Sequence, residues 1–220
     1  CEGGTMTDFL IIGGGISGLS CAKFIQEHSD EHTITILEEN AEIGYPQTRP
    51  GLIHNHELLR EYSSFKQMGS TGCRRPWAAK SISQQLTANG VNIHVRTRVQ
   101  SLNPLTFHGA GPTFTDSYDI MIDATNNQFS PENHIISQSR GEKTEFVGGV
   151  AIAGRQFETP DILTIRSDNT MECWYREKLP QIEGGWLEIM HGAFNSEEAS
   201  IDSSFERGKL LAEAALTSIC

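Results

Sequence analysis

The residues with the clearest chemical potential are the glycines at positions 13–18, which read GGGISG and match the spacing G-x-G-x-x-G. They follow a short apolar run at residues 9–12 and open a helical pattern over residues 16–27. In that setting the first glycine permits a tight turn, the second lets a diphosphate approach the backbone, and the third lets the helix pack on the strand. The alternative is a purely structural glycine turn.

The beginning of this predicted helix is suited to an anion, because its first N–H groups lack partners and carry a partial positive charge. We therefore predict that a dinucleotide diphosphate contacts this corner. The predicted contacts are Gly13, Gly15, Ile16, Ser17 and Gly18.

A carboxylate, Glu38, directly follows a second predicted strand at residues 33–37, which is rich in β-branched residues. Strand, glycine turn, helix and strand form one βαβ unit with a right-handed crossover. At that position Glu38 can accept hydrogen bonds from a pair of ribose hydroxyls. It would repel a 2′-phosphate, so NADP fits poorly, while FAD and NAD stay open as alternatives.

The composition argues against several classes of function. The chain has 220 residues and a formal net charge of −11, which disfavours nucleic acid as a partner. No apolar run reaches the length of about 18 residues that a membrane span needs, so we predict no membrane partner. The five cysteines are scattered without a CxxC pair. We therefore predict neither a disulfide framework nor a metal site, and a cytoplasmic location.

The remaining pattern predicts an α/β protein: a Rossmann-like domain with a parallel sheet plus a small antiparallel β segment. We predict helices near residues 57–65, over 76–89 and over 203–217, the last capped by Asp202 or Ser203. Strands are predicted over 91–95, within 99–114 and over 118–123, with a loop over 126–145. Residues 146–153, 161–166, 171–176 and 186–190 predict an antiparallel meander.

Several of these segments together resemble the two-dinucleotide-binding FAD flavoproteins, the group that includes glutathione reductase, amine oxidases and aromatic hydroxylases. DFLIIGGGISGLSCAKF with ITILEEN resembles the fingerprint of that group. Residues 88–102 and 118–125 are similar to its t-x-V-x-x-l and D-x-h-h-h-A-T-G segments, and residues 192–211 to the closing segment of its amine-oxidase-like members. The loop at 44–51 resembles the I-G-x-P loop of geranylgeranyl reductases and halogenases.

The resemblance implies FAD as the cofactor and adds contacts to the predicted site. It implies that Val99 meets the adenine through its backbone and that the turn at Ala124 and Thr125 lies close to the cofactor. It also implies that an acidic residue, assigned to Glu198, meets the ribityl–pyrophosphate region. Asn126 departs from the family pattern, because it replaces the usual glycine of the A-T-G turn.

Two further predicted cofactor contacts are Glu39, beside Glu38, and Arg49, in the loop that follows. Arg49, and likewise Arg74 and Arg75, would contact a phosphate or a substrate anion, or else be ordinary surface cations. The aromatic residues within 171–176 would form a substrate wall or pack within the sheet.

These predictions combine into a single FAD-binding domain over residues 6–220. Its cofactor core would span about 6–45, 75–126 and 186–220, and a reduced substrate-side segment about 127–185. The predicted function is that of an FAD-dependent oxidoreductase acting on a small-molecule substrate by a two-electron reaction, with NAD(P)H or oxygen as redox partner.

Two alternatives come from other classes of protein. The first alternative follows from length, because the chain is shorter than typical members of the group. It is a flavin-binding module without turnover, or one subunit of a homo-oligomer or complex whose partner supplies the substrate domain. The second alternative is an NAD-linked dehydrogenase on a plain Rossmann fold.

Overall fold

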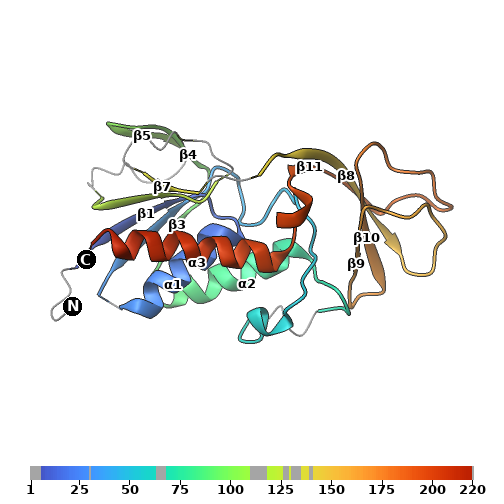
Figure 1. Cartoon of the computed structure of the whole chain (residues 1–220), viewed down its shortest axis with the longest axis horizontal. Coiled ribbons are helices and arrows are strands. Elements are labelled where there is room, and N and C mark those ends of the chain that lie inside the picture. The colour runs from blue at the N-terminus through green and yellow to red at the C-terminus, as the bar shows by residue number, and fades with distance from the viewer. Residues whose placement is uncertain are drawn as a thin grey trace. The chain divides into compact units, whose positions relative to one another are not determined.

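The structure, a computed structural model, describes residues 6–29, 31–62, 68–109, 118–125, 129, 135–138 and 141–219. It divides into two compact units (Figure 1). The parallel-sheet unit comprises residues 1–45, 82–139 and 205–220, and the antiparallel-sheet unit comprises residues 46–81 and 140–204. Helices α2 (Arg75–Ala88) and α3 (Ile201–Thr217) contribute residues to both units. The predicted division into a cofactor core and a substrate-side segment stays a prediction.

The parallel-sheet unit is built on a five-stranded sheet with the order β3-β2-β1-β6-β7, in which every described pairing is parallel. Its strands are β1 (Asp8–Ile12), β2 (Thr33–Leu37), β3 (Asn92–His94), β6 (Ile120–Asp123) and β7 (Ile136–Ser137). Helix α1 (Ile16–His28) connects β1 to β2. The predicted Rossmann-like parallel sheet is thus confirmed, and β7 is a strand that the sequence pattern did not indicate.

The two faces of this sheet are covered differently. Successive side chains of a strand point to opposite faces. On one face, Leu10 and Leu37 pack with Val99 in a buried cluster that also includes Leu102 from the hairpin of β4 (Thr97–Leu102) and β5 (Leu105–Gly109). Helices α1 and α3 lie along the other face (Figure 1). The buried strand residues on both faces explain why the sequence shows continuous apolar runs here.

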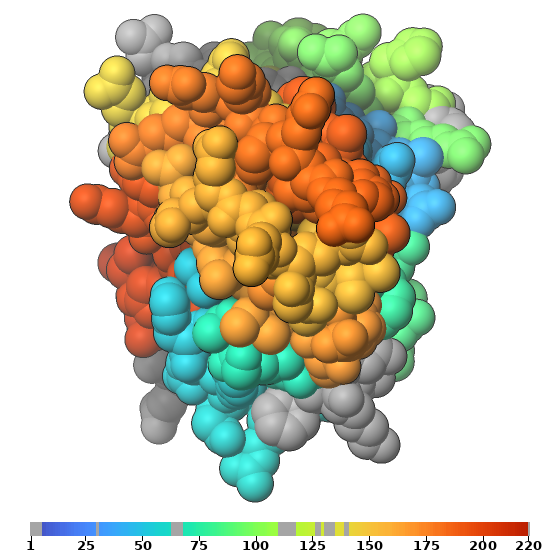
Figure 2. All heavy atoms as spheres, turned by 90° about the vertical axis from the view of Figure 1, so that its right-hand side faces the viewer, coloured from blue at the N-terminus to red at the C-terminus, as the bar shows by residue number. Residues whose placement is uncertain are grey.

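The antiparallel-sheet unit contains four strands in the order β11-β8-β10-β9. They are β8 (Thr144–Ile152), β9 (Ile162–Ile165), β10 (Thr170–Tyr175) and β11 (Glu188–Phe194). In Figure 2 the strands of this sheet and the loops between them are the yellow to orange spheres. The strands fall where the sequence predicts them, but the predicted meander is wrong, because β8 pairs with both β10 and β11.

Two local predictions in this unit are also corrected. The helix predicted near residues 57–65 is only the 3-10 turn η1 (His56–Leu59), and residues 63–67 lie outside the described part. Helix α3 is capped by Ser200, whose Oγ accepts from the N–H of Ser203 at 3.1 Å, and not by Asp202 or Ser203. The carboxylate of Asp202 instead accepts from the N–H groups of His54 and Asn55.

Candidate functional site

The glycine turn that connects β1 to α1 has a conformation that only glycine adopts easily. Gly13 has φ +104°, and its N–H donates to the carbonyl of Leu37 at 2.8 Å. A Cβ placed on Gly18 would overlap the carbonyl oxygen of Gly13, so α1 packs on the turn without a side chain between them. These are the turn and the close helix packing that the motif predicts.

Gly15, in contrast, faces open space, since a Cβ placed there would meet no atom within 4 Å. It is the N-cap of α1 and makes no side-chain cap hydrogen bond. The first bond of the helix runs from the N–H of Leu19 to the carbonyl of Gly15. The N–H groups of Ile16, Ser17 and Gly18 precede that bond, as expected for donors at a helix N-terminus. The corner therefore combines donors, a partial positive charge and room for a ligand.

Glu38 lies directly after β2 and is tied to the glycine turn. Its Oε2 accepts from the N–H of Gly14 at 2.7 Å, and its Oε1 accepts from the N–H and side-chain amide of Asn40 at 2.8 and 2.6 Å. A carboxylate oxygen has two lone pairs, so Oε2, which among the described residues accepts only the bond from Gly14, can still accept from a ribose hydroxyl. A Cβ on Gly14 would lie 2.5 Å from Cδ1 of Ile43 and 3.0 Å from Cβ of Glu38, so a side chain there would displace Ile43, which the motif alone did not indicate.

The turn after β6 lies against the glycine turn. Ala124 donates its N–H to the carbonyl of Ile12 at 2.9 Å, and a Cβ on Gly13 would lie 3.1 Å from the side chain of Thr125. Asp123, which is fully buried, accepts from the N–H of Thr125 at 2.8 Å and from its hydroxyl. Asp123 therefore shapes this turn, a role that the sequence pattern, which predicts only a strand here, does not indicate. Asn126 lies outside the described residues.

Hairpin β4–β5 begins beside Glu38, because Thr97 donates its N–H to the carbonyl of Glu38 at 2.8 Å. Val99 follows within β4 and is buried against the sheet. Glu39 is exposed, and its carboxylate lies 3.6 Å from Nε of Arg98. The structure therefore brings the glycine turn, Glu38, Val99 and the Ala124–Thr125 turn together at the carboxyl ends of β1, β2 and β6. In open α/β sheets ligands bind at such ends.

The other two predicted contacts, Arg49 and Glu198, lie in the antiparallel-sheet unit. Arg49 is buried and donates from Nη1 to the carbonyl of Glu198, in η4 (Ser196–Glu198), at 3.2 Å. The carboxylate of Glu198 accepts from the N–H of Gly141 at 3.3 Å. These two residues are thus neighbours within one unit.

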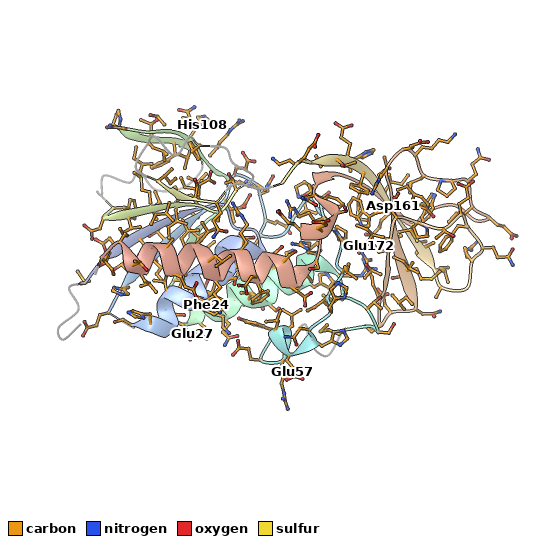
Figure 3. The ribbon with its side chains drawn as sticks, in the orientation of Figure 1. Phe24, Glu27, Glu57, His108, Asp161 and Glu172 are labelled. Carbon is orange, nitrogen blue, oxygen red and sulfur yellow. The ribbon has the colours of Figure 1, made fainter. Side chains whose placement is uncertain are left out.

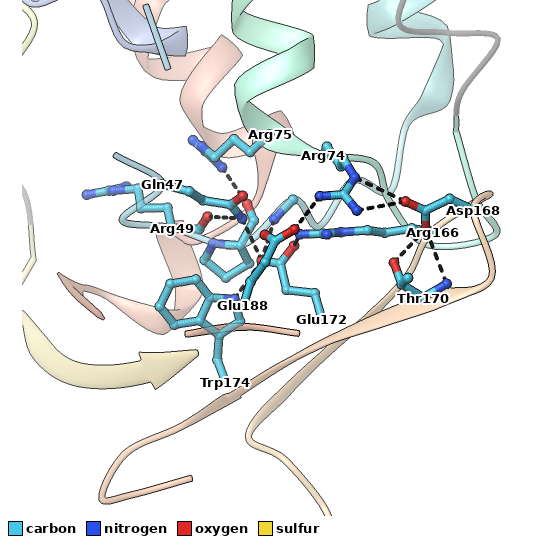
Figure 4. Close-up of polar contacts among 12 residues, drawn as sticks. Gln47, Arg49, Arg74, Arg75, Arg166, Asp168, Thr170, Glu172, Trp174 and Glu188 are labelled. Atoms are coloured by element: carbon cyan, nitrogen blue, oxygen red, sulfur yellow. Dashed lines mark hydrogen bonds and ion pairs between the residues drawn. The ribbon is translucent and has the colours of Figure 1, made fainter. Parts of the chain in front are cut away.

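Arg74 and Arg75 contact protein groups (Figure 4). Arg75 donates to the carbonyls of Pro50 and Ala199 and to the hydroxyl of Ser204. Arg74 pairs with Asp168 at 3.0 Å and with Glu188 at 2.6 Å. Burial alone would lower the pKa of Arg74, but its bonds to these two carboxylates outweigh burial and raise it. The contacts favour a structural role for both arginines.

A buried carboxylate, Glu172 in β10, organises this polar cluster. Figure 3 shows its place on the strand, and Figure 4 its contacts. Its Oε2 pairs with Nη2 of Arg166 at 2.5 Å, and both side chains are almost fully buried. Its Oε1 accepts from Gln47, the N–H of Gly51 and the indole of Trp174. The sequence does not indicate this centre, since an alternating strand pattern places Glu172 on one face of the strand but does not show what covers that face. Trp174 is fully buried, which favours sheet packing for this aromatic residue.

The described cysteines do not suggest a reactive thiolate. Burial raises the pKa of Cys73 to about 12 and that of Cys173 to about 12. Burial likewise raises the pKa of Cys21 far above its ordinary value. Among the described residues, no group of three or more His, Cys, Asp or Glu side chains is placed to hold a metal ion. Within the same residues, no helix combines the length and apolar character of a membrane span.

Comparison with known proteins defines the class of fold. Residues 11–60 match the family model of the NAD(P)-binding Rossmann-like domain. A search of curated proteins found no match to the sequence.

Solved structures share the fold over almost the whole chain at low sequence identity. A geranylgeranyl bacteriochlorophyll reductase-like protein from Thermoplasma acidophilum superposes with a TM-score of 0.70 at 11% identity, covering 97% of this chain and 79% of that one. L-α-glycerophosphate oxidase from Mycoplasma pneumoniae, with FAD bound, superposes with a TM-score of 0.60 at 10% identity. The match covers 98% of this chain and 95% of that one. A halogenase variant in complex with FAD also superposes with a TM-score of 0.60 at 10% identity, and the match covers 97% of this chain and 71% of that one. The resemblance to the FAD flavoproteins is thus confirmed at the level of the fold.

Proposed function

We propose that this chain binds FAD and acts as an FAD-dependent oxidoreductase on a small molecule. The observation that carries the proposal is the corner at Gly15, where a helix N-terminus faces open space beside the carboxylate of Glu38. The fold shared with two FAD-bound proteins supports FAD as the ligand.

The described residues fit the two ends of an adenosine diphosphate group. The N–H groups of Ile16, Ser17 and Gly18 would hold the diphosphate, and the absence of a side chain on Gly15 leaves room for it. Glu38 would accept from the ribose hydroxyls, and its bond from Gly14 fixes the carboxylate for that task. Val99 would contact the adenine, and Ala124 and Thr125 would border the diphosphate site on the side of β6.

FAD, when bound, supplies two-electron redox chemistry at its isoalloxazine ring. The contribution of the chain is therefore binding, orientation and exclusion of water. Glu39, Arg49 and Glu198 stay predicted cofactor contacts. We further propose a small-molecule substrate, with NAD(P)H or oxygen as redox partner, and a cytoplasmic location.

The absorbance spectrum of the purified protein, followed by mass analysis of any released cofactor, tests this proposal. We expect a yellow protein, either as isolated or after incubation with FAD, that releases FAD on denaturation. A colourless protein that binds NAD and not FAD would overturn the proposal in favour of an NAD-linked dehydrogenase, which the Rossmann family match alone also allows. A yellow protein without turnover of any oxidisable amine or alcohol would favour a flavin-binding module or a subunit of a complex.

A further inference from the structure

We infer that Arg207 is a positioning residue for dinucleotide binding, because it fixes the strand ends on which the candidate site is built. The inference rests on the proposed function. Arg207 lies in α3 and is only 8% exposed. Its Nη1 donates to the carbonyl of Ala124 at 3.0 Å, and its Nη2 donates to the carbonyl of Gln138 at 3.3 Å.

The two carbonyls that Arg207 contacts mark the carboxyl ends of neighbouring strands. Ala124 is the first residue after β6, and Gln138 is the first residue after β7, which pairs with β6 in parallel. The planar guanidinium presents several N–H donors in a fixed fork, so one side chain can bridge both carbonyls. Hydrogen bonds from a charged donor are also stronger than neutral ones. Arg207 therefore clamps the sheet at the edge where ligands of this fold bind.

The next residue, Gly208, fixes the same helix to α1. A Cβ on Gly208 would lie 2.5 Å from the carbonyl oxygen of Ser17 and 2.8 Å from the N–H of Cys21, so the backbones of α3 and α1 are in direct contact. Ser20 adds a hydrogen bond from its Oγ to the carbonyl of Phe205 at 3.0 Å. Figure 1 shows α3 running alongside α1 on the same face of the sheet.

Helix α3 thus contacts both segments that border the proposed diphosphate site, the start of α1 and the turn after β6. Gly208 contacts the first turns of α1, which carry the N–H donors proposed for the diphosphate. Arg207 donates to the carbonyl of Ala124, in the turn after β6 that borders the same proposed site. The start of α1 and the turn after β6 lie close together, since a Cβ on Gly18 would be 3.3 Å from Cβ of Ala124. The positive charge of Arg207 also opposes the effect of burial, which raises the pKa of Cys21 in α1. Losing the guanidinium would remove the donor to the carbonyl of Ala124, so the turn after β6 would be held less firmly against the start of α1.

The test compares Arg207→Met and Arg207→Lys with a charge-matched control, Lys209→Met, in the same helix. Lys209 is half-buried and contacts only Glu213 among the ion pairs described for α3. Binding of FAD is measured by titration of flavin fluorescence, and urea unfolding of the apoprotein is measured in parallel to correct for any unfolded fraction. Visible circular dichroism of the bound flavin at saturation reports cofactor position, which a loss of stability alone would not alter.

We expect Arg207→Met to weaken FAD binding by about tenfold or more, a change of about 1.4 kcal/mol, and to alter the visible dichroism. Arg207→Lys should lie between Arg207→Met and the wild type, and it carries the test if Arg207→Met does not fold. Lys209→Met should bind like the wild type. If the wild type binds FAD and both Arg207 variants bind it equally well, with unchanged dichroism, the inference is wrong while the proposed function stands. If the wild type binds no FAD, the proposed function fails, and the inference with it.

Discussion

In the parallel-sheet unit, the backbone N–H donors at the start of α1 follow Gly15, where an added Cβ would meet open space, and the carboxylate of Glu38 binds the N–H of Gly14. In the antiparallel-sheet unit, the most buried charged groups, Glu172 and Arg166, face each other. Within the described part of the chain, Gln47, Gly51, Arg166 and Trp174 donate to the carboxylate of Glu172. The comparison separates a corner that we propose binds a ligand from a cluster around Glu172 that holds the chain together.

This difference changes how charged residues of the sequence should be interpreted. Arginine and glutamate are the side chains most readily assigned to a binding site, yet Arg74, Arg75 and Glu172 contact protein groups. The corner that we propose for dinucleotide binding depends instead on glycines and main-chain donors. In this chain, a missing side chain at Gly15 is a stronger indication of a ligand than a cluster of charges.

The largest effect on the free energy of unfolding is expected for Glu172→Gln, which tests whether the cluster around Glu172 is structural. The change removes the negative charge but leaves the guanidinium of Arg166 buried, and Nε and Nη1 of Arg166 have no hydrogen-bond partner among the described residues. Breaking a buried ion pair from one side costs about 3–5 kcal/mol. Urea unfolding should show that loss. Glu188→Gln is the control, since its partly exposed pair with Arg74 should contribute about 0–1 kcal/mol. Equal stability of the two variants would contradict the assignment of Glu172 as a structural centre.

A smaller effect, on binding and on stability, is expected for Glu38→Ala. The variant loses the acceptor for the ribose hydroxyls and leaves the N–H of Gly14 and the donors of Asn40 without their partner. We expect the dissociation constant for FAD to rise by at least about tenfold and the free energy of unfolding to fall by about 1–3 kcal/mol. Calorimetric titration and urea unfolding measure these quantities. Glu27→Ala, which removes an exposed charge from α1, should change neither. Wild-type affinity in Glu38→Ala would show that this carboxylate does not contact the cofactor.

The smallest effect concerns the helix start in the antiparallel-sheet unit. Ser200→Ala removes the N-cap acceptor for Ser203 and should lower the free energy of unfolding by about 1 kcal/mol. Thr217→Ala at the exposed far end of α3 should change it by less than about 0.5 kcal/mol. Thermal unfolding followed by circular dichroism compares the two. A Ser200→Ala variant as stable as the wild type would mean that another group caps α3.

The sequence predicted most of the parallel-sheet unit, because its signals are local. The apolar runs of β1 and β2, the spacing of Gly13 to Gly18 and the carboxylate after β2 all lie within one stretch of chain. The features that it missed depend on contacts between distant segments. Glu172 meets Gly51 across 121 positions, and Arg207 meets Ala124 across 83. A single sequence contains no local pattern for such pairs.

The order of the antiparallel strands was missed for a similar physical reason. Alternation within a strand predicts that it pairs and which face is buried, but it does not specify the partner. The pairing of β8 with both β10 and β11 is set by the contacts of Phe146, Trp174 and Phe194 in one buried cluster. The helix cap shows the same limit on a smaller scale, since Asp202 is occupied by the N–H groups of a distant loop.

The most direct test of the central claim is FAD binding to Gly15→Thr, measured together with unfolding. Gly15 has φ −70° and ψ 173°, which threonine adopts without strain, and threonine is about as good an N-cap as glycine. The account predicts a free energy of unfolding within about 0.5 kcal/mol of the wild type and FAD affinity reduced by at least about tenfold, because the new side chain fills the space for the diphosphate. A Gly15→Thr protein that binds FAD as tightly as the wild type would contradict the placement of the cofactor at this corner.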